Sequence, residues 1–148
     1  SIMPEWNAVR VIAMIVADIM SREPVTVGLD DDLTRVKELF DLYRFHHLLV
    51  MTGGRLVGVV SDRDLLRATS PFIGRASERP QDVATLHRRV HQIMSRGLVT
   101  VPPGLPVQDA TRLMLAKRVS CLPVVEEDDT LVGIVTWRDQ LRALCPPA

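Results

Sequence analysis

The stretch Val16-Ala-Asp-Ile-Met-Ser-Arg-Glu-Pro-Val-Thr-Val27 recurs 74 residues later as Val90-His-Gln-Ile-Met-Ser-Arg-Gly-Leu-Val-Thr-Val101, with eight of twelve positions identical. A second pair of segments, residues 56–68 and 131–143, aligns at an offset of 75 with nine of thirteen positions identical. An internal period of this kind decides the architecture before any single helix or strand is assigned. The sequence therefore contains two copies of one structural unit.

Each copy shows the same order of hydrophobic patterns, which predicts helix, strand, helix, strand, strand, helix. Apolar residues at helical spacing predict an amphipathic lead helix in each copy: Val9, Ile12, Val16 and Ile19 in the first, Val83, Leu86, Val90 and Ile93 in the second. The next helix of the first copy begins after Asp31 or Asp32, because either residue suits an N-cap. A hairpin turning at residues 53–54 and a closing helix from Ser61 complete that copy, and Thr136 starts the closing helix of the second.

The two copies are expected to share one core. A unit of about 60 residues cannot cover both faces of a three-stranded sheet alone. We therefore predict an α+β (α/β) fold in which two pseudo-twofold-related repeats each hold a small three-stranded sheet flanked by helices. The first repeat with its lead helix spans residues 1–69, a linker spans 70–82, and the second repeat with its lead helix spans 83–148.

Composition excludes several classes of function. The chain has 148 residues, 24% of them charged, and a formal net charge of zero. Nucleic-acid binding needs an excess of basic groups to displace counterions, so we expect none. The longest early apolar stretch, residues 9–19, is far short of the roughly 20 residues of a membrane helix, so no membrane insertion is expected. Two cysteines without C-x-x-C spacing indicate no disulfide framework and fit a cytoplasmic location.

Motifs in a fixed order, occurring twice, resemble a tandem pair of cystathionine-β-synthase (CBS) domains, also called a Bateman module. They are Asp18-Ile-Met20 before the first strand, Cys121-Leu-Pro-Val-Val125, and the strand-to-helix junctions at residues 58–64 and 133–139. The resemblance covers roughly residues 9–143. It implies sensing rather than catalysis: an adenosine nucleotide, AMP, ADP or ATP and less often S-adenosylmethionine or NAD, binds between the repeats, and modules pair as homodimers.

The resemblance also implies two ligand sites, each built from both repeats. The first would combine Val16, Asp18, Ile19, Met20, Phe45, His46 and His47 with Thr136, Arg138 and Asp139. The second would combine Val90, Gln92, Ile93, Met94, Val119, Ser120 and Cys121 with Ser61, Arg63 and Asp64. For the apolar members taken one by one, plain core packing is the favoured interpretation.

The Gly-x-x-Ser/Thr-x-x-Asp junction carries the polar chemistry of these sites. Asp64 and Asp139 would accept hydrogen bonds from ribose hydroxyls, and the glycine would let a ligand approach the strand. Arg63 and Arg138 would neutralise phosphate charge. The same spacing predicts a helix capping box, so both interpretations stay open.

The two sites are expected to differ. His46 and His47 stand where the family often carries a group aimed at phosphate, and Ser120 and Cys121 replace them in the second repeat. A nucleotide with several phosphates is therefore favoured beside the histidines. Trp137, which replaces Asp of the first repeat, is expected on an exposed contact surface.

No catalytic or metal site is predicted. His87 and His91 share a helical face, but Arg88 stands where a zinc protease needs glutamate, and no third ligand is apparent. The favoured hypothesis is a regulatory homodimer whose nucleotide occupancy changes the activity of an unidentified partner protein. Two alternatives stay open: a ligand-free CBS scaffold for protein assembly, and the regulatory part of a larger enzyme or transporter. The chain's ends favour a complete module.

Overall fold

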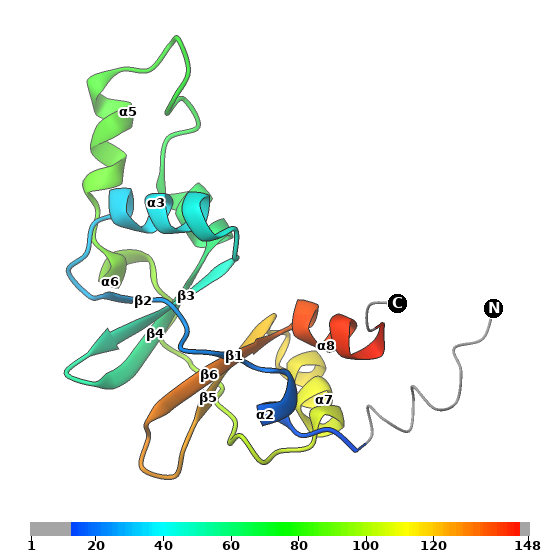
Figure 1. The fold of residues 1–148 in the computed structure, drawn as a ribbon. Coiled ribbons are helices and arrows are strands. Elements are labelled where there is room, and N and C mark those ends of the chain that lie inside the picture. The colour runs from blue at the N-terminus through cyan, green and yellow to red at the C-terminus, as the bar shows by residue number, and fades with distance from the viewer. Residues whose placement is uncertain (1–12, 146–148) are drawn as a thin grey trace. The chain divides into compact units, whose positions relative to one another are not determined.

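The computed structural model describes residues 13–145, which divide into two compact units (Figure 1). Within the described residues, unit 1 comprises 13–24 and 99–145, and unit 2 comprises 25–98. Unit 1 is thus built from two separate stretches of chain, whereas unit 2 is one continuous stretch.

Unit 2 holds the mixed sheet β2-β3-β4, in which β2 is parallel to β3 and β3 is antiparallel to β4. Its elements are β2 (Thr26–Gly28), α3 (Leu33–Tyr43), β3 (His47–Thr52), β4 (Arg55–Ser61), α4 (Asp62–Ala68), α5 (Pro80–Ala84), the 3-10 turn η1 (Thr85–His87) and α6 (Val90–Ile93). Asp32 caps α3 by accepting a hydrogen bond from the backbone N–H of Arg35 (3.1 Å), which confirms one of the two predicted N-caps.

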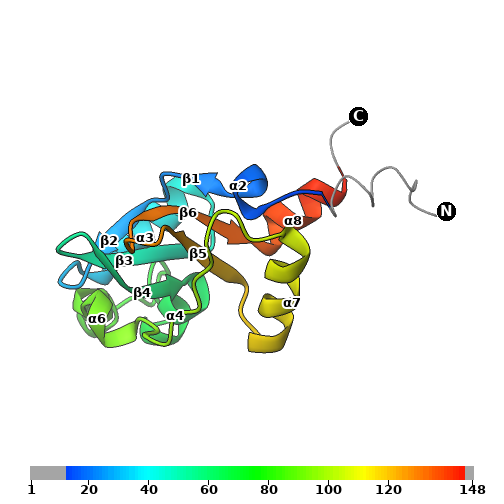
Figure 2. The ribbon, with the colours of Figure 1, turned by 90° about the horizontal axis from the view of Figure 1, so that it is seen from below.

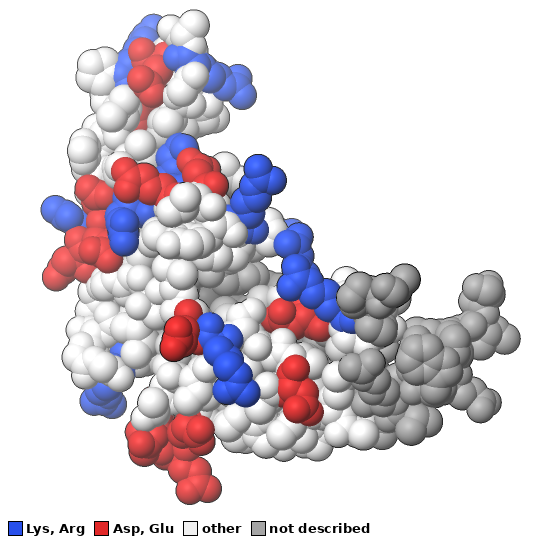
Figure 3. All heavy atoms as spheres, viewed as in Figure 1, with Lys and Arg blue, Asp and Glu red and all other residues white. Residues whose placement is uncertain are grey.

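Unit 1 holds the antiparallel sheet β1-β6-β5, whose order is visible in Figure 2. Its elements are α2 (Val16–Ile19), β1 (Ser21–Arg22), α7 (Val107–Lys117), β5 (Cys121–Val125), β6 (Leu131–Thr136) and α8 (Trp137–Leu144). The sequence predicted β5 and β6 but not β1. The four acidic residues of the β5–β6 turn gather at its tip in Figure 3. The equivalent β3–β4 turn of unit 2 has Gly53 and Gly54 in left-handed backbone conformations. The prediction of two three-stranded sheets flanked by helices is confirmed.

The predicted lead helix of the second repeat is broken in the structure. The segment forms α5, η1 and α6 because Arg88 and Arg89 are extended between η1 and α6. The backbone here forms hydrogen bonds with the start of α3 instead of along a helix. The carbonyl of Arg88 accepts from Leu33 N–H (3.0 Å), and Val90 N–H donates to the carbonyl of Asp31 (2.9 Å). In the first repeat, Val9 and Ile12 lie outside the described residues.

Equivalent hydrogen bonds hold the first lead segment, but they join it to the start of α7 in the other repeat. The carbonyl of Met14 accepts from Val107 N–H (3.0 Å), and Val16 N–H donates to the carbonyl of Leu105 (2.8 Å). β1 then pairs with β6, just as Ser95 pairs with Val59 in unit 2. The sequence repeats and the compact units therefore divide the chain differently.

Each unit has its own apolar core. The core of unit 2 is built on fully buried side chains from α3, β3, β4 and α6: Leu33, Val36, Leu48, Val50, Val60 and Val90. The core of unit 1 is built on buried side chains from α2, α7, β5 and β6: Val16, Ala110, Met114, Leu122, Val124 and Val135. Burial of this kind, at about 25 cal/mol per Å² of apolar surface, is the main source of stability for each unit.

Candidate functional site

Both strand-to-helix junctions form the predicted capping box. Ser61 N–H donates to Oδ2 of Asp64 (2.8 Å), and Asp64 N–H donates to Oγ of Ser61 (3.1 Å). Thr136 N–H likewise donates to Oδ2 of Asp139 (2.8 Å), and the threonine hydroxyl donates to the same oxygen (3.1 Å). These bonds engage one carboxylate oxygen of each aspartate and leave Oδ1 outside the box.

The junction glycines are needed for packing. A Cβ at Gly133 would lie 2.7 Å from Sδ of Met20 and 2.9 Å from the carbonyl oxygen of Ser21. A Cβ at Gly58 would lie 2.6 Å from Sδ of Met94. From the sequence these glycines were expected to let a ligand approach the strand, but the close approach in each unit is made by the lead segment itself.

The lead segments use their polar residues as caps. Oδ2 of Asp18 accepts from Ile15 N–H (2.9 Å), and Oε1 of Gln92 accepts from Arg89 N–H (2.7 Å). The apolar residues predicted for the sites belong to the two cores or pack against them: Val16, Ile19, Met20 and Val119 in unit 1, and Phe45, Val90, Ile93 and Met94 in unit 2.

Unit 2 gathers both histidines at its junction. Nδ1 of His46 lies 2.8 Å from Oδ2 of Asp62, and Asp62 N–H donates to the carbonyl of His46 (3.0 Å). His47 pairs in register with Ser61 across β3 and β4. Burial lowers the pKa of His47, against the opposing attraction of the Asp62 and Asp64 carboxylates. The imidazole is therefore harder to protonate than usual, and it lies near two carboxylates at the start of the central strand β3.

Unit 1 has different chemistry at the same place. Cys121 pairs in register with Thr136, and burial raises the pKa of its thiol to about 12. Trp137 N–H donates to the carbonyl of Ser120 (3.4 Å), which repeats the backbone bond made by Asp62. The Trp137 side chain is half-buried against the core of unit 1, so the expectation that it is exposed is wrong, and its role at a contact surface stays a prediction.

The structure brings together parts of each predicted set. Unit 1 contains the lead-segment residues and junction of the first set, Val16, Asp18, Ile19, Met20, Thr136, Arg138 and Asp139, and unit 2 contains Phe45, His46 and His47. Unit 2 contains the corresponding parts of the second set, Val90, Gln92, Ile93, Met94, Ser61, Arg63 and Asp64, and unit 1 contains Val119, Ser120 and Cys121. Both arginines are exposed.

The sequence analysis missed Asp62 as the partner of His46. A signal was present, because both positions change together between the repeats: His46 and Asp62 become Ser120 and Trp137. No group of three or more His, Cys, Asp or Glu side chains that could hold a metal ion occurs in residues 13–145. The described helices include none long and apolar enough to cross a membrane.

A family model described as CBS domain matches this chain twice, over residues 16–70 and 90–145. The chain belongs to the CBS domain family. A CBS domain-containing protein of Dictyostelium discoideum is 35% identical over 133 residues, which cover 88% of this chain and 91% of the relative. An inosine-5′-monophosphate dehydrogenase of Korarchaeum cryptofilum is 29% identical over 118 residues, which cover 80% of this chain but 22% of the enzyme.

Solved structures of CBS domain pairs share this fold. A crystal structure of CBSX2 in complex with AMP has a TM-score of 0.73 and 28% identity, and the match covers 88% of this CBS pair and 96% of that chain. A CBS domain pair in complex with 5′-methylthioadenosine and S-adenosyl-L-methionine has a TM-score of 0.72 and 25% identity, over 87% and 94% of the two chains. Both matches span the two repeats, so the chain is a CBS pair of the regulatory type.

Proposed function

We propose that this CBS pair is a non-catalytic sensor that binds an adenosine nucleotide and changes the activity of a partner protein. The observation that carries the proposal is the pair of junction aspartates, each held by its own capping box through Oδ2 alone. A carboxylate fixed in this way presents its other oxygen in a set direction. Such an oxygen suits the 2′- and 3′-hydroxyls of a ribose, which are paired donors.

The histidines of unit 2 support phosphate binding there. His46 and His47 lie beside Ser61 and its helix start, where hydroxyl and imidazole groups can donate to phosphate oxygens. Unit 1 offers Ser120 and a protonated Cys121 thiol at the matching positions, which are weaker partners for an anion. We therefore assign the more highly charged ligand, ADP or ATP, to the histidine side and AMP or S-adenosylmethionine to the other.

The solved relatives support the adenosine part. The ligands named for them, AMP in one and 5′-methylthioadenosine with S-adenosyl-L-methionine in the other, share an adenosine group and differ in what is attached to its 5′ position. A site that holds the ribose hydroxyls serves all of them. Differences in phosphate handling then decide which of them binds most tightly.

Regulation needs two arrangements of an assembly that bind nucleotide unequally. Leu66 of α4 and Leu141 of α8 occupy equivalent positions and are 74% and 62% exposed. An exposed leucine at the same position of both closing helices supports pairing of two chains through these helices. We accordingly expect a homodimer. Light scattering on the samples used for the binding experiments will measure its mass.

The test of the proposal is thermal unfolding of the protein with AMP, ADP, ATP, S-adenosylmethionine, NAD or cyclic dinucleotides. A ligand at 100 times its dissociation constant adds about 2.7 kcal/mol. For a chain of this length that raises the melting temperature by roughly 5 to 10 °C. Asp64→Asn and Asp139→Asn should each remove part of the shift, because the amide oxygen can replace Oδ2 in the cap while the second position becomes a donor.

Asp32→Asn is the matched control, since it makes the same change at the cap of α3, away from both junctions. It should leave the nucleotide shift intact. Absence of a shift with every ligand would contradict the sensor and favour the ligand-free scaffold. An unchanged shift in both junction variants would contradict the assignment of the ribose to these aspartates.

A further inference from the structure

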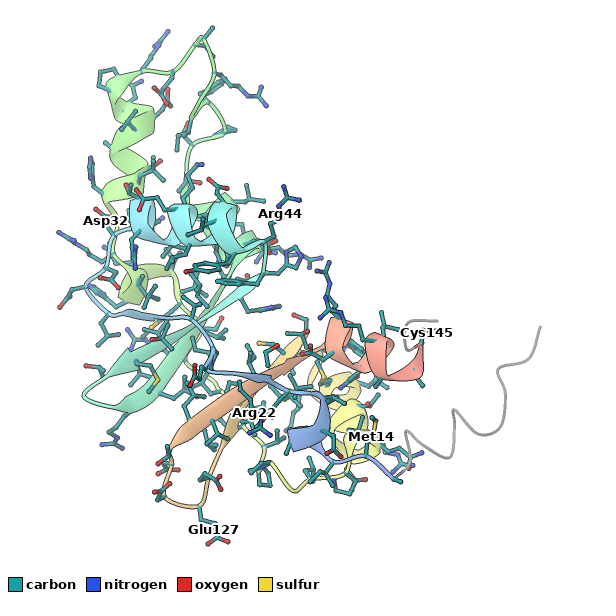
Figure 4. All side chains as sticks on the ribbon, in the orientation of Figure 1. Met14, Arg22, Asp32, Arg44, Glu127 and Cys145 are labelled. Atoms are coloured by element: carbon teal, nitrogen blue, oxygen red, sulfur yellow. The ribbon has the colours of Figure 1, made fainter. Side chains whose placement is uncertain are left out.

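His46 follows α3 and is bonded to the first residue of α4. The chain leaves α3 at Arg44, which Figure 4 labels, and reaches His46 two residues later. The carbonyl of His46 accepts a hydrogen bond from Asp62 N–H (3.0 Å), and Nδ1 of its imidazole lies 2.8 Å from Oδ2 of the same aspartate. The backbone and the ring of His46 are thus both tied to one residue, which fixes the direction of the ring.

The contact with Asp62 decides which ring nitrogen carries the hydrogen. An ionised carboxylate only accepts hydrogen bonds, so the hydrogen in this contact lies on Nδ1. In the neutral ring, Nε2 then has a lone pair and no hydrogen. Nε2 has no hydrogen-bond partner in the part of the chain that the structure describes, and the side chains of His46 and Asp62 are 58% and 42% exposed. The nitrogen that a ligand can reach is therefore an acceptor.

A phosphate group would meet this nitrogen as one acceptor facing another. The phosphate oxygens of a nucleotide are ionised near neutral pH and offer no hydrogen. A hydrogen bond between Nε2 and a phosphate oxygen forms only when Nε2 gains a proton, which turns the ring into an imidazolium with two donors. Histidine is the side chain whose charge changes most readily in this pH range. Phosphate binding at this ring is thus tied to the uptake of a proton.

The charges around the ring act in the same direction. The charged and titratable residues near it are Lys37, Asp41 and Arg44 from α3 and its end, His47 from β3, and Asp62, Arg63 and Asp64 from α4. Lys37 is paired with Asp41 (2.7 Å), and the two arginines are matched in number by two aspartates. Burial lowers the pKa of His47. A phosphate therefore meets a net positive charge here only after His46 has been protonated.

We propose that the junction of unit 2 binds a phosphate-bearing nucleotide together with one proton, which His46 takes up on Nε2. This inference rests on the proposed function, because it needs a nucleotide phosphate at this junction. Asp62 is a positioning residue, since it holds the neutral ring in the tautomer that cannot donate to phosphate. The protein then responds to nucleotide and acidity together, because a ligand that binds with a proton binds more tightly as the pH falls.

Unit 1 lacks both members of the pair. Ser120 and Trp137 stand at the positions of His46 and Asp62, and neither titrates near neutral pH. Burial raises the pKa of the neighbouring Cys121 thiol to about 12, so this group stays protonated as well. The proton linkage is therefore particular to the junction of unit 2.

The test is isothermal titration calorimetry of the protein with ADP at pH 8.0, in two buffers that differ in their enthalpy of ionisation. The difference between the two heats counts the protons taken up per ADP. The second pKa of a phosphate group is about 6, so at this pH the uptake belongs to the protein. We expect close to one proton per ADP bound beside the histidines, and an affinity that falls by up to about tenfold per pH unit above pH 7.5. Adenosine, which has no phosphate, should bind without proton uptake.

Asp62→Asn separates the tautomer from the presence of the imidazole. The asparagine amide can donate to Nδ1, which leaves the hydrogen of the neutral ring on Nε2, so proton uptake should fall to less than about half while ADP still binds. His46→Gln should abolish the uptake and weaken ADP. Asp109→Asn is the matched control, because it makes the same change in the first turn of α7, and His91→Gln removes an exposed histidine elsewhere in unit 2. Both controls should keep the proton uptake of the parent protein.

The outcomes distinguish this proposal from the sensor on which it rests. Binding of ADP with no proton uptake would overturn the proposal and leave the nucleotide sensor standing. An uptake that Asp62→Asn leaves unchanged would also overturn it, because the tautomer would not be the cause. Failure of every nucleotide to bind would contradict the proposed function and, with it, the proton linkage.

Discussion

The two units use the same backbone at their junctions and different side chains around it. Gly58 and Gly133 accommodate equivalent methionines, and Asp64 and Asp139 close equivalent capping boxes. The neighbouring positions differ. Three of them change from His46, Asp62 and Leu65 in unit 2 to Ser120, Trp137 and Gln140 in unit 1. The glycine, methionine and aspartate of the junction are identical in the two repeats, whereas the positions around them decide what each half can recognise.

The largest effect is expected at the shared glycines. Gly133→Ala should lower the free energy of unfolding by about 3 kcal/mol, because its Cβ would meet the backbone carbonyl of Ser21 as well as Met20. Gly58→Ala should cost about half as much, since its closest neighbour is the flexible end of Met94 and the Ser95 carbonyl is 3.1 Å away. Urea denaturation measures both.

Gly97→Ala serves as the control for these glycines, because nothing lies within 4 Å of a Cβ built there. It should change stability by less than about 0.5 kcal/mol. If all three variants were equally stable, close packing of the lead segments would not be the reason for glycine at the junctions.

A smaller effect of opposite sign is expected at Gln140, which is buried where the other unit has Leu65. Its Nε2 donates to the sulfur of Met114 (2.9 Å), and its Oε1 is buried with no hydrogen-bond partner among residues 13–145. Gln140→Leu should therefore raise the free energy of unfolding by about 1–2 kcal/mol. Gln108→Leu on the exposed face of α7 should leave it nearly unchanged. A loss of stability in Gln140→Leu would mean that the amide is needed where it is.

The smallest effect is expected on how the stability of the protein depends on pH. Burial lowers the pKa of His47 below its ordinary value of 6.5, so the unfolded chain binds a proton more readily than the folded one. This histidine adds no instability above pH 6.5, and it destabilises the fold as the pH falls below that value. The melting temperature should accordingly fall less between pH 7.5 and 5.5 in His47→Gln than in the parent protein.

The exposed His87 provides the comparison for this experiment, and His87→Gln should keep the parent pH dependence. Unit 1 has Cys121 at the position of His47, and a thiol with a pKa of about 12 does not titrate in this range. Identical pH profiles for the two histidine variants would remove His47 as a source of acid sensitivity.

The regular elements were predictable because their signals are local. Short apolar runs indicated the hairpins, with paired glycines marking the turn of the first, and the Ser61-x-x-Asp64 spacing indicated a capping box that the structure contains. Asp32 was one of two predicted caps for the same local reason. In the candidate site, the capping geometry and the core packing of the apolar members could be predicted in the same way.

The pairing of the lead segments was not predictable, because it is not local. Ser21 and Arg22 form a strand too short to show alternation, and repeats of similar sequence offer two nearly equivalent partners for it. The break at Arg88 follows from hydrogen bonds to residues more than 50 positions away. The burial of Gln140 also escaped prediction, since a single polar residue on a helix gives no sign of which face it occupies.

The discontinuous construction of unit 1 has a consequence for the order in which the chain acquires structure during synthesis. Every strand of unit 2 lies within residues 25–98, so this unit can close while the ribosome is still adding the second hairpin. β1 has already emerged by then, but its partner β6 is more than 100 residues away. The lead segment of the first repeat must therefore stay unpaired with β6 until translation of β6 is complete.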